Sequence, residues 1–211
     1  GRAVARQVDP GGDLAGPGGG VPAAPALSPG GAGGGAALAG FPASGIHSNG
    51  LTLAREVTTR GHSYTDPFPV AEYGRPNCSR VADGETPRIG DVLLEPTRIY
   101  TDLLGPLRRA EARAAAHVTG GGWTNLTRLG EHRYVIDDPF DPDPVLDFVR
   151  AEGSVDDGEM HRTFNMGTGL VAALDPADAD AVVEATDGRV IGHVEAADGD
   201  AHVEIRDLSL E

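Results

Sequence analysis

Residues 41–55 read Phe41-Pro-Ala-Ser-Gly-Ile-His-Ser-Asn-Gly-Leu-Thr-Leu-Ala-Arg55, and the rest of the chain is organised around them. An apolar run that begins at Ala36 predicts a strand, which Pro42 and two following glycines bring to a tight turn. Apolar residues at helical spacing come next. The stretch therefore predicts a strand, a turn and the start of a helix, with His47 in the turn.

The turn carries residue types that suit a phosphate ligand. Ser48 or Asn49 is expected to cap the helix, because either side chain can accept a backbone N–H of the first turn. Backbone N–H groups at a helix start attract anions, and His47 beside them can exchange a proton near neutral pH. A second interpretation stays open, in which His47 only hydrogen-bonds a neighbouring backbone carbonyl.

Charge and cysteine content exclude several functions. The 211-residue chain has a formal net charge of −15, and all 17 basic residues are arginine. This surface repels nucleic-acid phosphates, so we expect no nucleic-acid partner. Self-repulsion should weaken folding at low salt, which leads us to hypothesise a halophile-like cytoplasm. Cys78 is the single cysteine and no apolar run could span a membrane, so we expect a cytoplasmic setting without membrane contact.

Composition divides the chain into a leader and a folded domain. The first 40 residues contain 13 Gly, 10 Ala and 5 Pro, which predicts a disordered leader over residues 1–35. The folded domain is expected over residues 36–211. Within it, residues 62–90 carry four prolines and little periodicity, which predicts a long surface excursion.

Strands and helices are expected to alternate along the domain. Further strands are predicted at residues 112–118, 134–136, 170–174, 189–194 and 201–205, and helices at 51–61, 100–109, 123–129, 144–153 and 177–186. An acidic turn joins the last two strands, which are expected to form a hairpin-like pair. This order predicts an α+β fold, a three-layer α/β/α sandwich with a mixed sheet.

Most catalytic motifs are absent from the sequence. No HExxH or CxxC spacing supports a metal site, so no metal ligand is predicted, and the nucleophile elbow and Walker A loop are missing. What remains is a second glycine turn, in which His117 precedes Thr119, Gly120, Gly121 and Gly122. Glycine lets backbone approach a phosphate closely, although three glycines also permit a plain chain reversal. Two glycine turns that each carry a histidine favour a shared phosphorylated ligand.

Four segments resemble a known enzyme family. They are GIHSNG (residues 45–50), LLEPTRIY (93–100), AHVTGGG (116–122) and EMHRTFNMG (159–167). In the same order, they resemble the C-terminal domain of the phosphoribosylformylglycinamidine cyclo-ligases, also called aminoimidazole ribonucleotide synthetases. The resemblance covers about residues 36–205. Selenophosphate synthetase and thiamine-monophosphate kinase, which also use ATP, share the architecture.

The resemblance implies a ligase of de novo purine biosynthesis. Such an enzyme uses ATP and Mg²⁺ to cyclise formylglycinamidine ribonucleotide to aminoimidazole ribonucleotide, and its complete form is a homodimer. His47 and His117 would serve charge stabilisation or proton transfer, whereas Asn165 and Arg162 would mainly hold the neighbouring loop and strand. The residues implied in substrate and phosphate binding are Ser48, Asn49, Gly50, Thr119, Gly120, Gly121 and Gly122.

The sequence also departs from the family. Its members carry, ahead of this domain, another domain with an acidic motif for metal and ATP, and nothing in this sequence matches that motif. We therefore expect ATP and Mg²⁺ to be bound mainly by a domain absent from this chain, on a separate domain or polypeptide. Activity of the isolated chain stays open. The alternatives are a non-catalytic phosphoribosyl-binding module, a truncated remnant, and an enzyme like selenophosphate synthetase or thiamine-monophosphate kinase.

Overall fold

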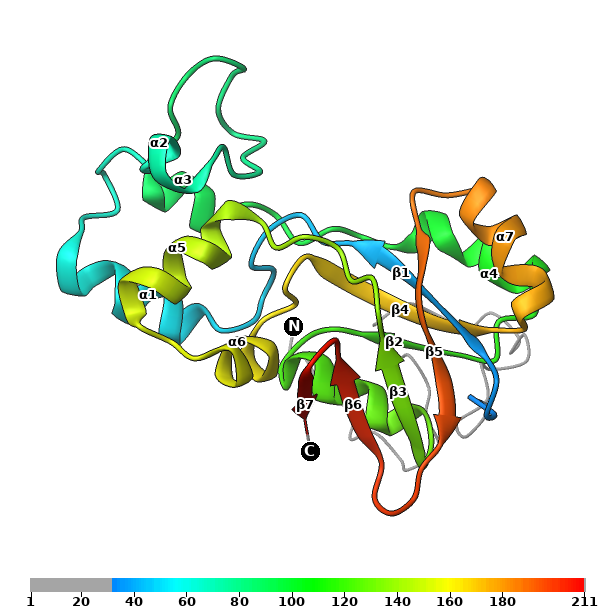
Figure 1. The fold of residues 1–211 in the computed structure, drawn as a ribbon. Helices are drawn as coiled ribbons and strands as arrows, with labels where there is room; N and C mark the ends of the chain where they lie inside the picture. The colour runs from blue at the N-terminus through cyan, green and yellow to red at the C-terminus, as the bar shows by residue number, and fades with distance from the viewer. Residues whose placement is uncertain (1–31, 211) are drawn as a thin grey trace, which may run out of the picture.

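Residues 32–210 are described by the computed structural model, and they form a mixed seven-stranded sheet (Figure 1). The strands are β1 (Ala37–Pro42), β2 (Ala114–His117), β3 (His132–Ile136), β4 (Thr168–Leu174), β5 (Arg189–Ala196), β6 (His202–Ile205) and β7 (Leu208–Leu210). Their order is β2-β4-β1-β5-β3-β6-β7. Only the neighbours β3 and β6 of this sheet are parallel, and its other neighbouring strands are antiparallel.

Short helices connect the strands. They are α1 (Leu51–Gly61), α2 (Val70–Tyr73), α3 (Ile89–Leu93), the 3₁₀ helix η1 (Thr101–Leu103), α4 (Leu104–Arg109), the 3₁₀ helix η2 (Gly122–Leu129), α5 (Pro144–Gly153), α6 (Asp157–Thr163) and α7 (Pro176–Glu184). Asp143, Asp156 and Asp175 cap α5, α6 and α7, because each carboxylate accepts a backbone N–H of the first turn. Proline at the first position of α5 and α7 adds a preset backbone angle.

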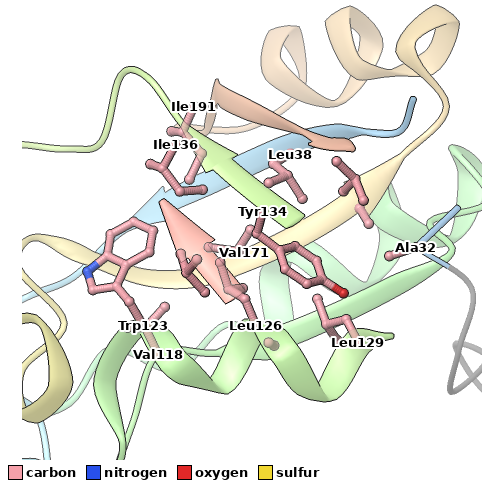
Figure 2. Close-up of a cluster of buried hydrophobic side chains, with 14 of the residues drawn as sticks. Ala32, Leu38, Val118, Trp123, Leu126, Leu129, Tyr134, Ile136, Val171 and Ile191 are labelled. Atoms are coloured by element: carbon pink, nitrogen blue, oxygen red, sulfur yellow. The ribbon is translucent and has the colours of Figure 1, made fainter. Parts of the chain in front are cut away.

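Both faces of the sheet are covered by helices. On one face, η2 packs Trp123, Leu126 and Leu129 against sheet residues such as Leu38 and Val171 (Figure 2). On the other face, α4 and α7 pack against the alternate residues of β1 and β4. The α+β, three-layer sandwich with a mixed sheet that the sequence predicts is confirmed.

A further group of helices extends from one end of the sheet (Figure 1). Helices α1, α3, α5 and α6 enclose a separate cluster of buried side chains, among them Phe148 and Phe164. Residues 62–90 contribute Phe68 and Ile89 to this cluster, with 1% and 0% of their surface exposed. The prediction of a surface excursion was therefore wrong for these two side chains. Their burial was not predicted because they lie far apart in a segment without apolar periodicity.

The first helix begins in a way that the sequence did not predict. Gly50 occupies the N-cap position of α1 with a φ of 62°, and no side chain caps the helix. The predicted caps are engaged elsewhere, since the hydroxyl of Ser48 lies 3.3 Å from the hydroxyl of Thr97 and Asn49 donates to the carbonyl of Val118. A Cβ on Gly50 would also collide with the ring of Phe164. Both the backbone conformation and the packing therefore require glycine at this position.

The last two predicted strands do not pair with each other. Strand β3 lies between β5 and β6, antiparallel to β5 and parallel to β6. Residues 197–201, which link β5 to β6, thus cross two strand spacings of roughly 10 Å in total, well within the reach of five residues. The terminal hairpin is formed instead by β6 and β7, and the sequence did not predict β7.

Most of the predicted leader, residues 1–35, lies outside the described residues. From Ala32 onward the chain is described, and Ala32 is fully buried in the core of the sheet. Gly35 donates its backbone N–H to the carbonyl of Val194 at 2.7 Å. No helix within residues 32–210 has both the length and the apolar character needed to cross a bilayer.

Candidate functional site

Two turns meet beside the ends of β1 and β2; His47 lies in one of them, and His117, the last residue of β2, directly precedes the other. We call them the first glycine turn (residues 43–50) and the second glycine turn (residues 118–122). The rings of His47 and His117 lie nearly parallel, with their centroids 6.0 Å apart and their planes at 12°. Tyr100 packs edge-on against both, at 6.4 Å from the His47 ring and 5.3 Å from the His117 ring. The structure thus brings the two predicted histidines together and adds a tyrosine.

His47 is held in an unusual conformation at the end of this cluster. Its φ is 62°, which non-glycine residues rarely adopt, and only 5% of its surface is exposed. Its Nε2 accepts the backbone N–H of Ser44 at 3.0 Å. Gly169 in β4 makes room for the ring, because a Cβ there would lie 2.8 Å from Cε1 of His47 and would collide with the hydroxyl of Tyr100.

Burial keeps both imidazoles neutral near pH 7. Desolvation lowers the pKa of His47 to about 4, and the neighbouring His117 and Arg98 contribute to this lowering. Desolvation also lowers the pKa of His117. Without a ligand both rings therefore act as neutral groups, and the two predicted roles, charge stabilisation and proton transfer, stay predictions. A neutral ring can hydrogen-bond to a ligand, and it can accept a proton where one of its nitrogens is free.

One buried asparagine amide fixes the first glycine turn in place. Asn165, which is fully buried, donates to the carbonyls of Gly45 and Ile46 at 2.8 and 3.2 Å. Its Oδ1 accepts the backbone N–H of Gly167 at 2.9 Å. Asn165 therefore holds the neighbouring loop, as the family resemblance implies, whereas Arg162 is exposed on α6.

Two further asparagine amides hold the other turn. Asn49 donates to the carbonyl of Val118 at 3.1 Å, which ties the first glycine turn to the second. Asn125 of η2 donates to the carbonyls of Thr119 and Gly120 at 3.3 and 3.1 Å. The predicted site residue Asn49 thus has a cross-linking function, and its amide faces protein rather than an open surface.

Different structural constraints apply at the three glycines of the second glycine turn. Gly122 packs so closely on the backbone of His161 and Arg162 in α6 that no Cβ fits, and its φ is 54°. Gly121 is exposed and has a φ of 97°, whereas Gly120 is exposed and a Cβ added to it would meet no atom within 4 Å. Chain reversal and packing explain Gly121 and Gly122, and the exposed backbone at Gly120 and Gly121 is free to approach a ligand.

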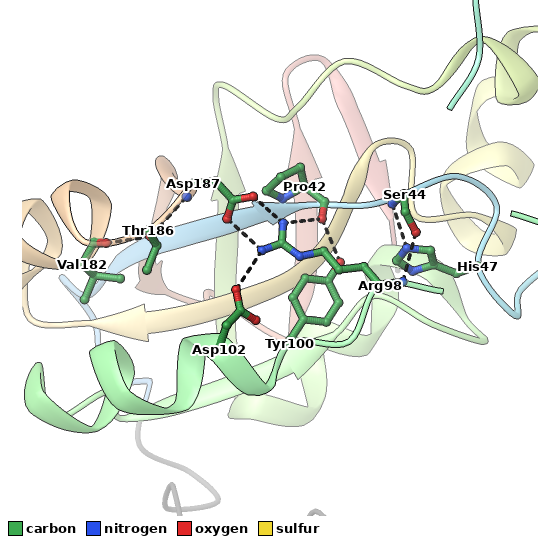
Figure 3. A network of polar contacts seen from close by, with 10 residues as sticks. Pro42, Ser44, His47, Arg98, Tyr100, Asp102, Val182, Thr186 and Asp187 are labelled. Carbon is green, nitrogen blue, oxygen red and sulfur yellow. Dashed lines mark hydrogen bonds and ion pairs between the residues drawn. The ribbon is translucent and has the colours of Figure 1, made fainter. Parts of the chain in front are cut away.

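A charged network supports the site from outside (Figure 3). Arg98 donates two hydrogen bonds to Asp187, at 2.6 and 2.9 Å, and its guanidinium lies 4.9 Å from the centre of the Tyr100 ring. The hydroxyl of Ser44 accepts the backbone N–H of Arg98 and donates to the carbonyl of Pro96. The segment LLEPTRIY therefore anchors the first glycine turn through backbone and side-chain contacts.

Sequence reasoning missed Tyr100, Arg98 and Gly169. The first two lie in a segment that resembles the family, but that segment has neither a histidine nor a glycine turn to mark it. Gly169 directly precedes the strand predicted at residues 170–174, and it lies within β4 only in the structure, where a glycine inside a strand marks close approach by another group. That signal would have required the strand to be predicted from residue 168 onward.

The described residues offer little to a metal ion. Within residues 32–210, no group of three or more His, Cys, Asp or Glu side chains is placed to hold one. The carboxylates of Asp187 and Asp102 near the site both pair with Arg98. These residues do not fit a Mg²⁺ ion. Two surface hollows, of about 370 and 450 Å³, are lined by residues outside the histidine cluster.

Comparison with known proteins identifies relatives. Residues 33–204 match the family described as AIR synthase related protein, C-terminal domain. The chain is 38% identical over 175 residues to the phosphoribosylformylglycinamidine cyclo-ligase of Methanosarcina mazei, a match that covers 82% of this chain and 47% of that protein. The cyclo-ligase of Methanopyrus kandleri is 42% identical over 171 residues, covering 78% and 45%.

Among solved structures, the hydrogenase maturation protein HypE aligns with 89% of this chain and 56% of its own chain. The identity is 17% and the TM-score is 0.47. The chain spans about half the length of the two cyclo-ligases that it matches.

Proposed function

The chain belongs to the family described as AIR synthase related protein, C-terminal domain. We propose that it forms the substrate-side half of a phosphoribosylformylglycinamidine cyclo-ligase. The reaction is the ATP-dependent cyclisation of formylglycinamidine ribonucleotide to aminoimidazole ribonucleotide. The observation that supports this proposal is the approach of the His47 and His117 rings, 6.0 Å apart, between two asparagine-braced glycine turns.

The residues of this chain would bind and orient the ribonucleotide. The exposed backbone of Gly120 and Gly121 suits a phosphate, which is bound well by N–H groups in a glycine-rich turn. The amine that closes the ring must lose a proton, and His117, whose pKa is lowered by burial, is unprotonated and able to accept it. Ser48, which is exposed beside the cluster, would contact the substrate through its hydroxyl.

ATP and Mg²⁺ are assigned to the half of the relatives that this chain does not cover. When bound, ATP supplies the phosphoryl group that turns the formyl-derived amide oxygen into a leaving group. No residue of this chain is proposed as a metal ligand. A homodimer of the complete enzyme, a cytoplasmic setting and a high-salt environment are retained as parts of the same proposal.

Reconstitution tests the proposal. The purified chain is incubated with formylglycinamidine ribonucleotide, ATP and Mg²⁺ at high salt, alone and with the N-terminal half of the Methanosarcina mazei enzyme. Turnover only in the mixture supports a substrate-side half. Ribonucleotide binding without turnover in either case would favour a non-catalytic binding module, and the absence of both would refute the proposal.

A pair of histidine variants makes the test specific. His47→Ala in the active mixture should lower turnover by roughly 10²-fold, the usual scale for a lost proton-transfer or hydrogen-bonding group. His132→Ala is the matched control, because His132 lies at the start of β3 and outside the site. Equal activities of the two variants would remove His47 from the mechanism.

A further inference from the structure

The backbone conformation and the burial of His47 are energetically unfavourable, and the fold alone does not explain them. Its backbone is in the left-handed region, with a φ of 62° in a residue other than glycine. Its Nδ1 is buried and has no hydrogen-bond partner among the described residues. A buried polar group without a partner destabilises the folded state, and strained backbone of this kind is concentrated at functional sites.

The hydrogen bond on the other ring nitrogen determines which nitrogen carries the proton. Nε2 accepts the N–H of Ser44, so Nε2 has no proton of its own in this arrangement. A neutral imidazole then carries its proton on Nδ1. The orphaned atom is therefore an N–H donor that lacks an acceptor, and it cannot itself act as a base.

None of the groups around the ring supplies that acceptor. The hydroxyl of Tyr100 donates to the carbonyl of Pro42 at 2.9 Å. The guanidinium of Arg98 is a donor only and is bound to Asp187. His117 stacks on His47 face to face, so its nitrogens do not lie along the edge of the ring. The acceptor must come from outside the described residues.

We propose that His47 is a neutral hydrogen-bond donor, fixed with its proton on Nδ1 by the Ser44 N–H, and that Nδ1–H meets an acceptor oxygen of the bound ribonucleotide. The identity of the ligand rests on the proposed function; the position of the proton does not. Nδ1 is covered in the chain alone, so this contact requires that the first glycine turn move when the ligand binds. His47 then touches substrate without exchanging a proton with it.

Nitrogen NMR on the ¹⁵N-labelled chain tests both parts. The His47 ring is assigned by the disappearance of its signals in His47→Gln, and His132→Gln, at the start of β3 and outside the site, serves as a control that should leave them in place. The expected result is a proton on Nδ1 and none on Nε2 at pH 7. A proton on Nε2, or on both nitrogens, would overturn the inference whatever the chain binds.

Ligand titrations complete the experiment. Ribose 5-phosphate, formylglycinamidine riboside and formylglycinamidine ribonucleotide are added separately, and binding is followed through the backbone amide of Gly120. Nδ1–H should shift with the ribonucleotide while Nε2 stays unprotonated. A shift seen with ribose 5-phosphate but not with the riboside assigns the acceptor to the phosphate, the reverse assigns it to the formyl amide, and a shift with both assigns it to the ribose.

The outcomes separate the two proposals. Binding at Gly120 with an unmoved Nδ1–H overturns the donor role of His47. A chain that binds none of the three probes refutes the proposed function, and with it the ligand half of this inference. A wrong proton position in a chain that does bind refutes the inference alone.

Discussion

Replacing Asn165 with alanine should destabilise the domain through the first glycine turn. The side chain is fully buried and makes three hydrogen bonds, two to the carbonyls of Gly45 and Ile46 and one from the N–H of Gly167. Alanine removes all three and leaves three buried backbone groups to find other partners. The change also releases the turn that holds His47.

The magnitude follows from those lost bonds. A buried donor or acceptor left without a partner costs about 1–3 kcal/mol, and some of this is recovered when water enters the space. We therefore expect a loss of about 3 kcal/mol in the free energy of unfolding. For a domain of this size the melting temperature should fall by roughly 6–12 °C.

Urea unfolding at high salt, followed by circular dichroism, measures the effect. Asn49→Ala is the graded comparison, because Asn49 makes one buried hydrogen bond, to Val118, and should lose about 1 kcal/mol. Thr52→Ala is the control on the exposed face of α1 and should stay within about 0.5 kcal/mol of the parent. A loss of less than about 1 kcal/mol for Asn165→Ala, or a smaller loss than for Asn49→Ala, would refute the reasoning.

Other predictions follow from the same site and surface. Gly169→Ala crowds Tyr100 and His47 and should cost about 1–3 kcal/mol in urea unfolding, whereas Gly120→Ala, with open space around it, should cost less than about 0.5 kcal/mol. The pKa of His47 is lowered to about 4 from 6.5, so the unfolded chain binds more protons between these values, and stability should fall as pH drops through that window. His47→Gln should flatten that fall, and an equal fall in both proteins would contradict it. The melting temperature should rise between low and molar KCl, since salt screens the net charge of −15; a constant value would count against the halophile hypothesis. In the reconstituted enzyme, His47→Ala should lower turnover by roughly 10²-fold while His132→Ala should not.

The candidate site could be predicted in part because its residues are marked locally. Each histidine stands next to a glycine turn, and such turns are visible in a short stretch of sequence. The distance between His47 and His117 was not visible, because it depends on β2 and β1 both flanking β4 in the sheet. Tyr100 and Gly169 reach the cluster only through tertiary contacts, and neither has a local pattern that specifies its neighbours.

Proton positions in the site were also beyond sequence reasoning. A histidine in a polar turn is expected to titrate near neutral pH. In the structure, the carbonyl and amide groups nearby are bonded to one another, and burial lowers the pKa of His47 to about 4. The neutral state of the ring is a property of its surroundings, which come from four separate segments.

The sequence by itself determined the elements of this protein and their order. Apolar periodicity, proline and aspartate at helix starts, and glycine at turns act over a few residues, so β1, β2, β4, α5 and α7 could be located without knowing their neighbours. The family resemblance depends on equally local motifs. These signals also sufficed for a mixed sheet with helices on both faces.

Only the tertiary structure decided how distant segments pair and pack. Strand β3 lies between β5 and β6, antiparallel to β5 and parallel to β6. No residue of the turn that links β5 to β6 indicates that another strand lies between them. Phe68 and Ile89 are buried because helices from elsewhere in the chain close over them. Pairing and burial are properties of contacts between segments remote in sequence, and their energies become defined only once those segments are brought together.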